Sequence, residues 1–258
     1  MTRYLAYKLA AAVTLAATGT VWSQTNGNAT QDGAIILAAI VTSESLPPYA
    51  PNLDVSRFSA NVTNPFFPLI PGTVFIYEGT RDGLPRRAEV TVTGETKTIM
   101  GVPCVVTRDV VTSKDTLVEK TTDWYAQDSD GNVWYFGEDT AEYENGVVTN
   151  THGTWMAGVN GALPGIIMTA VPKVGEAYRQ EYLPGMAEDY ARVISDIATA
   201  RIPAGDFENV VLTEDTDLLD RNKFEIKSYG RGVGYLGSQG IVNGHFEVVS
   251  LVSMLKPN

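Results

Sequence analysis

The sequence has little cysteine and little histidine. Cys104 is the single cysteine among 258 residues, so no disulfide can close within the chain, and a small fold held by disulfides is excluded. Because Cys104 lies in the apolar run 102–106, we expect its thiol to be buried in the core. The two histidines, His152 and His245, have no second histidine or cysteine nearby, which leaves zinc chemistry poorly supported. We expect no cofactor.

Basic residues are also scarce. The chain has 19 Lys and Arg against 30 Asp and Glu, which gives a formal net charge of −11 at pH 7. A field of this sign repels polyanions at long range. We therefore expect neither nucleic acid nor an anionic membrane surface as a partner.

The apolar run near the N-terminus is too short to be a membrane-spanning helix. Residues 9–21 follow two basic residues, an arrangement typical of a secretion signal. Val21 and Ser23 stand at the −3 and −1 positions of a cut before Gln24. We predict that residues 1–23 are a cleaved signal peptide, with an uncleaved anchor as the alternative. The mature protein would be secreted or periplasmic, with no stable membrane insertion.

The rest of the chain divides by composition. Residues 24–45 hold a polar, flexible leader and a short apolar segment, 34–41, that is either a first strand or a short helix. Residues 46–258 are predicted to form a single β-rich domain. Its first part, 46–71, is rich in proline, and we expect an ordered wrap around the domain because several apolar side chains there need burial. These are Phe58, Phe66, Phe67 and Leu69.

From Thr73 onward apolar and polar residues alternate with the period of a half-buried strand. Residues 88–93, for example, place Ala, Val and Val against Glu, Thr and Thr. The dipeptides Asp130-Gly131 and Asn145-Gly146 separate such stretches, and both readily supply the positive φ of hairpin turns. The sequence therefore predicts a mainly all-β fold of antiparallel hairpins with few short helices.

Two segments do not follow the alternation clearly. Residues 152–170 are apolar and rich in glycine, and we expect them to fold over a sheet face or a cavity mouth. Residues 187–201 fit both a helix and a strand, and we favour a strand because Pro203 and Gly205 close the segment as a turn.

Two short stretches resemble a known family. Residues 71–79, PGTVFIYEG, resemble the opening strand of secreted bacterial lipoprotein carriers of the LolA/LolB type, and 202–207, IPAGDF, resemble a turn between two later strands of those proteins. The resemblance implies a strongly curved antiparallel sheet, an open or half barrel, around a hydrophobic cavity that holds acyl chains. The helical plug of such carriers has only 34–41 and 152–170 as candidate counterparts.

Acidic residues of the central hairpin form the strongest candidate site. A two-residue turn at Asp130-Gly131 would place Asp123 directly opposite Glu138. Facing carboxylates repel each other unless a proton, a cation or a basic partner lies between them. One protonated and one ionised carboxyl is also the pair that acid/base work on a sugar requires. A three-residue turn, with Gly131 in the left-handed region, would instead pair Asp123 with Gly137.

If the protein is an enzyme, we expect Asp123, Glu138 and Glu181 to be catalytic. Glu181 belongs to a second acidic group around Pro184-Gly185. The plainer interpretation is that these acids line a solvated face, where Lys114, Lys120 or Arg179 balance them, and that the nearby aromatic side chains are sheet core. The candidate ligand-binding residues are Glu119, Tyr125, Trp134, Tyr143, His152 and Trp155.

Two further motifs are weak. Asp128, Asp130 and Asn132 have the alternate spacing of calcium ligands, but the glycine and the twelfth residue do not match an EF-hand. A looser oxygen-only calcium site remains as an alternative to a plain hairpin tip. Residues 237–240, GSQG, are interpreted as a glycine-rich turn and not as the strained serine turn of a hydrolase.

Three functions follow from these patterns. The first is an exported binding or carrier protein for an apolar or amphipathic ligand, which would be a small molecule, a lipid or a glycan. The second is a secreted carbohydrate-active enzyme, a glycosidase or lyase, that uses carboxyl groups as acid and base. The third is a structural protein of the cell envelope. The sequence leaves the oligomeric state open.

Overall fold

The computed structural model describes residues 49–257. The predicted signal peptide, residues 1–23, and the leader, residues 24–45, lie outside the described residues. The described part contains one short 3-10 helix, η2 (Val55–Arg57), and sixteen strands in a single sheet. No helix in this part is long and apolar enough to cross a membrane.

The strands follow one another along the chain with short connections. They are β1 (Phe58–Ser59), β2 (Val74–Arg81), β3 (Leu84–Ile99), β4 (Val102–Ser113), β5 (Thr116–Asp128), β6 (Val133–Glu144), β7 (Val147–Asn150), β8 (Trp155–Met156), β9 (Leu163–Met168), β10 (Ala177–Arg179), β11 (Glu181–Tyr182), β12 (Asp189–Ile202), β13 (Gly205–Asp217), β14 (Phe224–Gly230), β15 (Gly234–Val242) and β16 (His245–Leu255).

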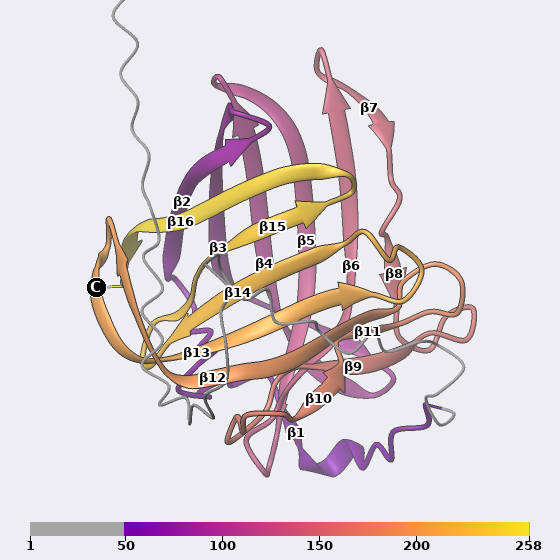
Figure 1. Cartoon of the computed structure of the whole chain (residues 1–258). Helices are drawn as coiled ribbons and strands as arrows, with labels where there is room; N and C mark the ends of the chain where they lie inside the picture. The colour runs from indigo at the N-terminus through magenta and orange to yellow at the C-terminus, as the bar shows by residue number, and fades with distance from the viewer. Residues whose placement is uncertain (1–48, 258) are drawn as a thin grey trace, which may run out of the picture.

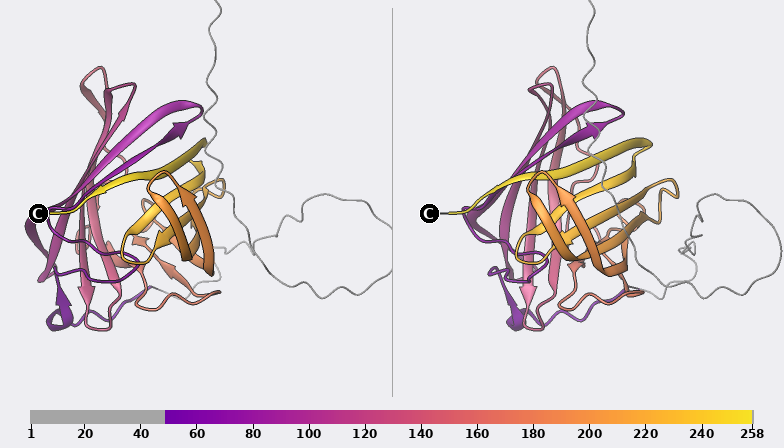
Figure 2. Two further views of the ribbon diagram at one scale, coloured as in Figure 1. Left: turned by 90° about the vertical axis from the view of Figure 1, so that its left-hand side faces the viewer. Right: turned by 60° about the vertical axis from the view of Figure 1, so that its left-hand side comes forward.

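The sheet curls until it nearly closes into a barrel (Figures 1 and 2). Its order is β10-β12-β13-β14-β15-β16-β2-β3-β4-β5-β6-β9-β11, and the pairs are antiparallel. Strand β2 therefore lies beside the last strand, β16. At the two ends of the path stand β10 and β11, which only Gln180 separates, so the chain itself joins the ends. The predicted all-β fold with a curved antiparallel sheet is confirmed.

The proline-rich segment before β2 packs across the bottom of the barrel, as expected for a wrap. Val62 bridges Leu69, and both side chains are buried. The ring of Phe67 extends further inward and contacts Tyr125 and Tyr229, with ring centroids 5.3 and 6.4 Å away. Apolar burial of this size is worth on the order of 2 kcal/mol for each large side chain, which explains why a segment with little ladder pairing is ordered.

Cys104 is confirmed as a buried free thiol. It packs in a core cluster formed by β4, β5, β6 and the strands that cover them. Burial raises the pKa of the Cys104 thiol to about 12, because a thiolate is costly in apolar surroundings. The thiol is therefore protonated and unreactive in the folded protein.

Two segments whose structure the sequence left open are strands. Residues 187–201 contribute β12, which has three bulges against β13, so the strand that we favoured is correct. In the stretch 152–170, β8 pairs with β6, and β9 pairs with β6 and β11. This stretch therefore completes the barrel wall and is not the helical plug of a lipoprotein carrier.

The expectation of a turn at residues 237–240 is wrong. These residues lie inside β15. A Cβ atom at Gly237 would lie 2.1 Å from the Val249 carbonyl oxygen, and one at Gly240 would lie 2.0 Å from that of Phe224. Glycine is needed at both positions because the neighbouring strand lies too close for a side chain. Two glycines required for this reason give the segment the composition of a turn.

Candidate functional site

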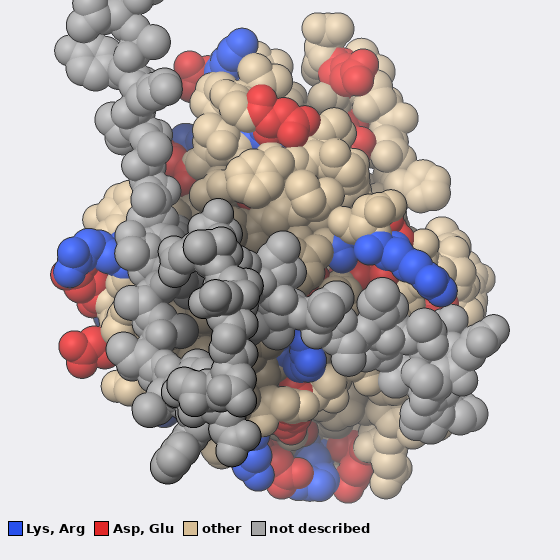
Figure 3. Space-filling view, in the orientation of Figure 1, with Lys and Arg blue, Asp and Glu red and all other residues tan. Residues whose placement is uncertain are grey.

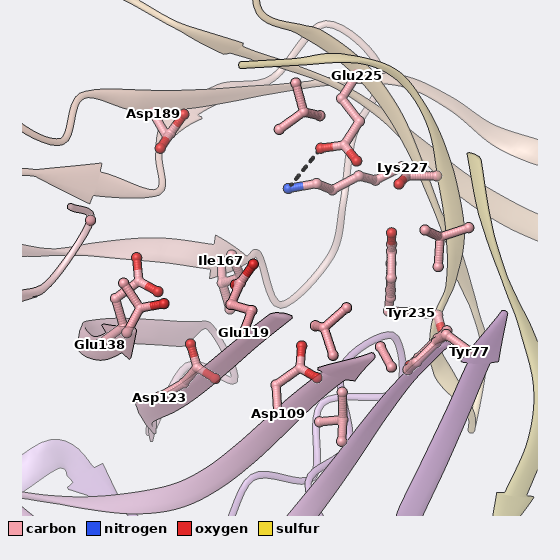
Figure 4. A pocket seen from close by; sticks show the side chains of 18 of the residues that line it. Tyr77, Asp109, Glu119, Asp123, Glu138, Ile167, Asp189, Glu225, Lys227 and Tyr235 are labelled. Carbon is pink, nitrogen blue, oxygen red and sulfur yellow. Dashed lines mark hydrogen bonds and ion pairs between the residues drawn. The ribbon is translucent and has the colours of Figure 1, made fainter. Parts of the chain in front are cut away.

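The concave face of the sheet encloses a cavity of about 980 Å³, a volume typical of small-molecule sites. Strands from both halves of the sheet line it, together with Phe67, Pro68 and Leu69 of the wrap. Figure 4 shows that side chains from several strands point into this one space. The main parts of the lining are an acidic wall, a series of aromatic side chains and four basic residues, Arg81, Arg86, Lys223 and Lys227.

Five carboxyl groups form the acidic wall. Asp109 comes from β4, Glu119 and Asp123 from β5, Glu138 from β6 and Glu181 from β11. Asp109 pairs with Thr121 in the ladder, and Asp123 pairs with Glu138. On the face shown in Figure 3, the visible charged side chains are mixed in sign and scattered.

The facing of Asp123 and Glu138 depends on a β-bulge. The hairpin tip has a three-residue loop, with Asp128 bonded to Asn132 and Gly131 at φ +97°. Alone, this turn would have paired Asp123 with Gly137. One extra residue of β6 opposite Trp124 corrects the register. The turn is thus the three-residue alternative, and the Asp123–Glu138 pair, which we expected only with a two-residue turn, is present because of the bulge.

Asp123 is the most strongly bound carboxyl of the wall. Its Oδ1 accepts a hydrogen bond from the Tyr135 hydroxyl at 2.6 Å, and its Oδ2 accepts one from the Thr107 hydroxyl at 3.2 Å. Burial raises the pKa of Asp123 to about 6, although these two hydrogen bonds oppose the rise. Asp123 lies deep in the protein and still keeps some exposed surface, because it faces the cavity and not packed atoms.

Asp109, Glu138 and Glu181 carry larger shifts. Burial, with Asp123 and Glu119 nearby, raises the pKa of Asp109 to about 8. Burial also raises the pKa of Glu138 well above its ordinary value, and the charges of Glu181 and Asp123 add to the rise. The pKa of Glu181 is raised well above its usual range by burial and then by Asp189. Burial and like charge therefore disfavour the ionised form of these three carboxyls.

The lysines of the cavity are already paired. Lys227 Nζ lies 2.9 Å from Asp215 Oδ2 and 3.5 Å from Glu225 Oε2. Burial alone would lower the pKa of Lys227, but these two carboxylates raise it well above its ordinary value. Lys223 forms an ion pair with Asp189. Both lysines are thus paired with carboxylates. Lys227 lies on the side of the cavity opposite Asp109 and Asp123 (Figure 4).

Aromatic rings form a continuous arc along the cavity. Each ring contacts the next with centroids 4.8 to 6.4 Å apart, the separation of favourable aromatic pairs. We call this series the aromatic arc; it consists of Phe75, Tyr77, Tyr235, Tyr229, Phe67, Tyr125 and Tyr135. All of these except Tyr135 line the cavity. The resemblance to lipoprotein carriers implied a hydrophobic cavity, whereas this one is apolar along the arc and acidic along the wall.

Only three of the six candidate ligand-binding residues line the cavity. Glu119, Tyr125 and His152 line the cavity, and Trp134, Tyr143 and Trp155 do not. Because the three-residue loop shifts the register near the tip, Tyr125 pairs with Tyr135, and Trp134 turns to the other face, where it contacts Phe58. Trp134 was expected to bind a ligand together with Tyr125, but it does not line the cavity.

The other two aromatic candidates, Trp155 and Tyr143, contact protein side chains away from the cavity. Trp155 is 3% exposed in the core cluster under β6 and packs edge-on against Tyr135. Tyr143 stands near the end of β6, where the Lys120 amine lies 5.9 Å from the centre of its ring. Neither contributes to the cavity.

The three candidate calcium ligands hold the hairpin tip. Asp128 accepts hydrogen bonds from the backbone of Asp130 and Asn132 and from the indole of Trp134. Asp130 pairs with Arg57 at 2.6 Å, and Asn132 accepts a hydrogen bond from the Ala170 backbone. Across residues 49–257, no three His, Cys, Asp or Glu side chains are arranged to hold a metal ion. The hairpin-tip interpretation accounts for these residues.

Sequence reasoning missed Asp109 and the lysines. Asp109 interrupts the apolar run of β4 at a position where alternation places it on the same face as Thr107 and Val111. A charged residue on the concave face of a strand was the available signal. Lys227 lies on β14 and Lys223 directly precedes that strand. Both are far from Asp123 in sequence, and no local pattern links them.

Comparisons with known proteins add only a distant likeness. No protein-family model and no curated protein matches the sequence. Among solved structures, the chain is similar to a candidate exported protein with a YmcC-like fold from Bacteroides fragilis, at a TM-score of 0.45 and 15% identity over 74% of this chain and 99% of that one. It is also similar to a candidate lipoprotein from Parabacteroides distasonis, at 0.37 and 14% over 74% and 98%. Neither is named as a lipoprotein carrier, so that resemblance stays a prediction.

Proposed function

We propose that this chain is an exported binding or carrier protein for an amphipathic small molecule, which it holds inside the barrel. The observation that carries the proposal is the divided lining of one cavity, with the aromatic arc for an apolar part and the acidic wall for a polar part. The volume of about 980 Å³ suits a ligand with an alkyl chain and a headgroup. The sequence supports export through the predicted signal at residues 1–23.

The test is to fill the cavity and measure binding. Ala88 lies opposite Tyr77 in the ladder and lines the cavity, whereas the next residue, Glu89, is exposed. Ala88→Trp should abolish binding of dodecyl amphiphiles with maltoside, ammonium or carboxylate headgroups, as measured by isothermal titration calorimetry. Glu89→Trp should bind as the unmodified chain does. If the unmodified chain binds none of these amphiphiles, the proposal is wrong.

A carbohydrate-active enzyme is the second candidate, and the Asp123–Glu138 pair favours it. The two facing carboxyls have different surroundings, since Asp123 accepts two hydrogen bonds from hydroxyls and Glu138 has Glu181 as its strongest charged neighbour. One group could then give a proton while the other stays ionised. Release of reducing ends from a polysaccharide panel, lost in Glu138→Gln and kept in Asp139→Asn, would support this function. The absence of any release would exclude it for those polysaccharides.

A further inference from the structure

The charges inside the cavity do not balance, because ten carboxyl groups line it against the four basic side chains of Arg81, Arg86, Lys223 and Lys227. Arg81 and Arg86 act on Glu119 and Glu247. The ion pairs that face the cavity use Lys223 and Lys227 for carboxylates of β12, β13 and β14. The groups of β4, β5 and β6 have other carboxyls as their strongest charged neighbours. Asp123 and Glu119 act on Asp109, Glu119 acts on Asp123, and Glu181 and Asp123 act on Glu138.

An unpartnered oxygen points to a missing donor. Oδ1 of Asp109 is buried and has no hydrogen-bond partner, although buried polar atoms in proteins are almost always bonded. The side chain lies on the cavity between Asp123 and the ring of Tyr77 (Figure 4). Rotation of a carboxyl about its last bond is soft, so this oxygen can turn to a donor inside the cavity.

The nearby rings favour a cation in the same place. Tyr125 stands two residues from Asp123 on β5 and stacks on Tyr135 with centroids 4.8 Å apart. Tyr77 and Tyr235 line the cavity beyond Asp109. The face of an aromatic ring attracts ammonium groups, and a carboxylate beside it adds to the attraction. The same carboxyls, when ionised, would repel a phosphate or a carboxylate headgroup.

We infer that the amphipathic ligand is cationic and that its ammonium group binds between Asp109, Asp123 and Glu138. Its apolar chain lies along the aromatic arc. This inference rests on the proposed binding function and adds the class of headgroup. A bound primary ammonium supplies the donor that Asp109 lacks, and a primary or quaternary ammonium places a positive charge among carboxyls that otherwise face one another.

The test compares headgroups on one alkyl chain. Calorimetric titration of the purified full chain at pH 8 with dodecylamine, dodecyltrimethylammonium, dodecyl maltoside and dodecanoate should give at least tenfold tighter binding of the two cationic probes. Asp109→Asn and Glu138→Gln should each weaken the cationic probes at least fivefold and leave dodecyl maltoside unchanged. Asp139→Asn, beside Glu138 on β6 and exposed, is the matched control and should change nothing.

The outcomes separate the two proposals. Equal affinity for the maltoside and the cationic probes would overturn the cationic headgroup and leave the binding function standing. Failure of all four probes to bind would overturn the binding function. If either variant fails to fold, as judged by circular dichroism, the headgroup comparison on the unmodified chain decides the matter alone.

Discussion

Charged residues at adjacent positions of one strand have opposite surroundings in this protein. On β6, Glu138 faces the cavity among other carboxyls, whereas Asp139 is exposed on the outer face. On β4, Asp109 faces the cavity and Arg108 is exposed, where it pairs with Glu95. Alternation along a strand thus places one of two adjacent charges in solvent and the other inside the barrel. The inner one bears the cost of burial.

Asp109→Asn should make the protein more stable. The unfolded chain ionises this group at pH 8, but in the folded state burial and two neighbouring carboxyls oppose its charge. An amide of the same shape removes that conflict, and we expect the free energy of unfolding to rise by about 1 to 2 kcal/mol. Chemical denaturation at pH 8 measures it. Asp139→Asn should stay within about 0.5 kcal/mol, and a loss of stability in Asp109→Asn would contradict the role of burial.

The two facing carboxyls should respond differently to the same change. Glu138→Gln removes a group opposed by burial and by four other carboxyls and should stabilise the fold by about 1 to 2 kcal/mol at pH 7. Asp123→Asn also removes the acceptor of either Tyr135 or Thr107, so its gain should be smaller or absent, since a lost hydrogen bond costs about 1 kcal/mol. Thermal unfolding of both variants provides the comparison. An equal gain in both would show that the two hydrogen bonds do not matter.

At the scale of elements, a bulge decides which side chains meet. Near the tip of the β5–β6 hairpin the register brings Tyr125 to Tyr135, and beyond the bulge it brings Asp123 to Glu138. The extra residue lies at Phe136 and Gly137, and Gly137 has φ +125°. A Cβ there would lie 2.3 Å from the Trp155 carbonyl oxygen. Glycine at position 137 therefore permits both the backbone conformation of the bulge and the close approach of β8.

Gly137→Ala should damage the site and the fold together. The substitution combines a strained φ with a clash against backbone atoms, so we expect a loss of about 2 to 4 kcal/mol. Gly146→Ala, at φ +79° in a hairpin turn with nothing within 4 Å of the added carbon, isolates the strain and should cost about 1 kcal/mol. Urea denaturation of the two variants measures the difference. Equal losses would mean that the approach of β8 can relax freely.

At the scale of the whole molecule, barrel closure brings like charges together from distant parts of the chain. The sheet joins β2 to β16 and brings β11 beside β9, so Glu181 reaches the cavity that Asp109 and Asp123 line. Bringing these carboxyls together lowers the free energy of unfolding when they are ionised. Each carboxyl whose pKa is raised binds its proton more tightly in the folded chain than in the unfolded one.

Stability should therefore fall as pH rises from about 4 to about 8. Unfolded carboxyls ionise near pH 4, whereas Asp123 and Asp109 keep their protons up to about pH 6 and about pH 8. Between these limits unfolding releases protons, so raising the pH favours the unfolded chain. Melting temperatures from pH 4.5 to 9 should decline, with a shallower decline in Asp109→Asn and an unchanged one in Asp139→Asn. A melting temperature that rises over this range would contradict the buried acidic wall.

Much of the fold could be predicted because its signals are local. Alternation with period two and paired Asp-Gly and Asn-Gly turns specify antiparallel strands within about ten residues of each other. The site was only partly predictable. Hairpin pairing with a two-residue turn predicted Asp123 opposite Glu138. Trp134, a candidate ligand-binding residue, lies on the other face, because a one-residue change of loop length reverses every side chain near the tip.

The sequence by itself determined the strand content, the acidic balance, the buried lone thiol and the hairpin that carries Asp123 and Glu138. Only the tertiary structure decided that β10 and β11 close the sheet and that the concave face is hollow. It also decided that Asp109, Glu181 and Lys227 share one cavity. The reason is physical: strand formation follows from neighbours in the chain, whereas curvature and closure depend on bulges, glycine contacts and pairings between residues far apart, which no local pattern records.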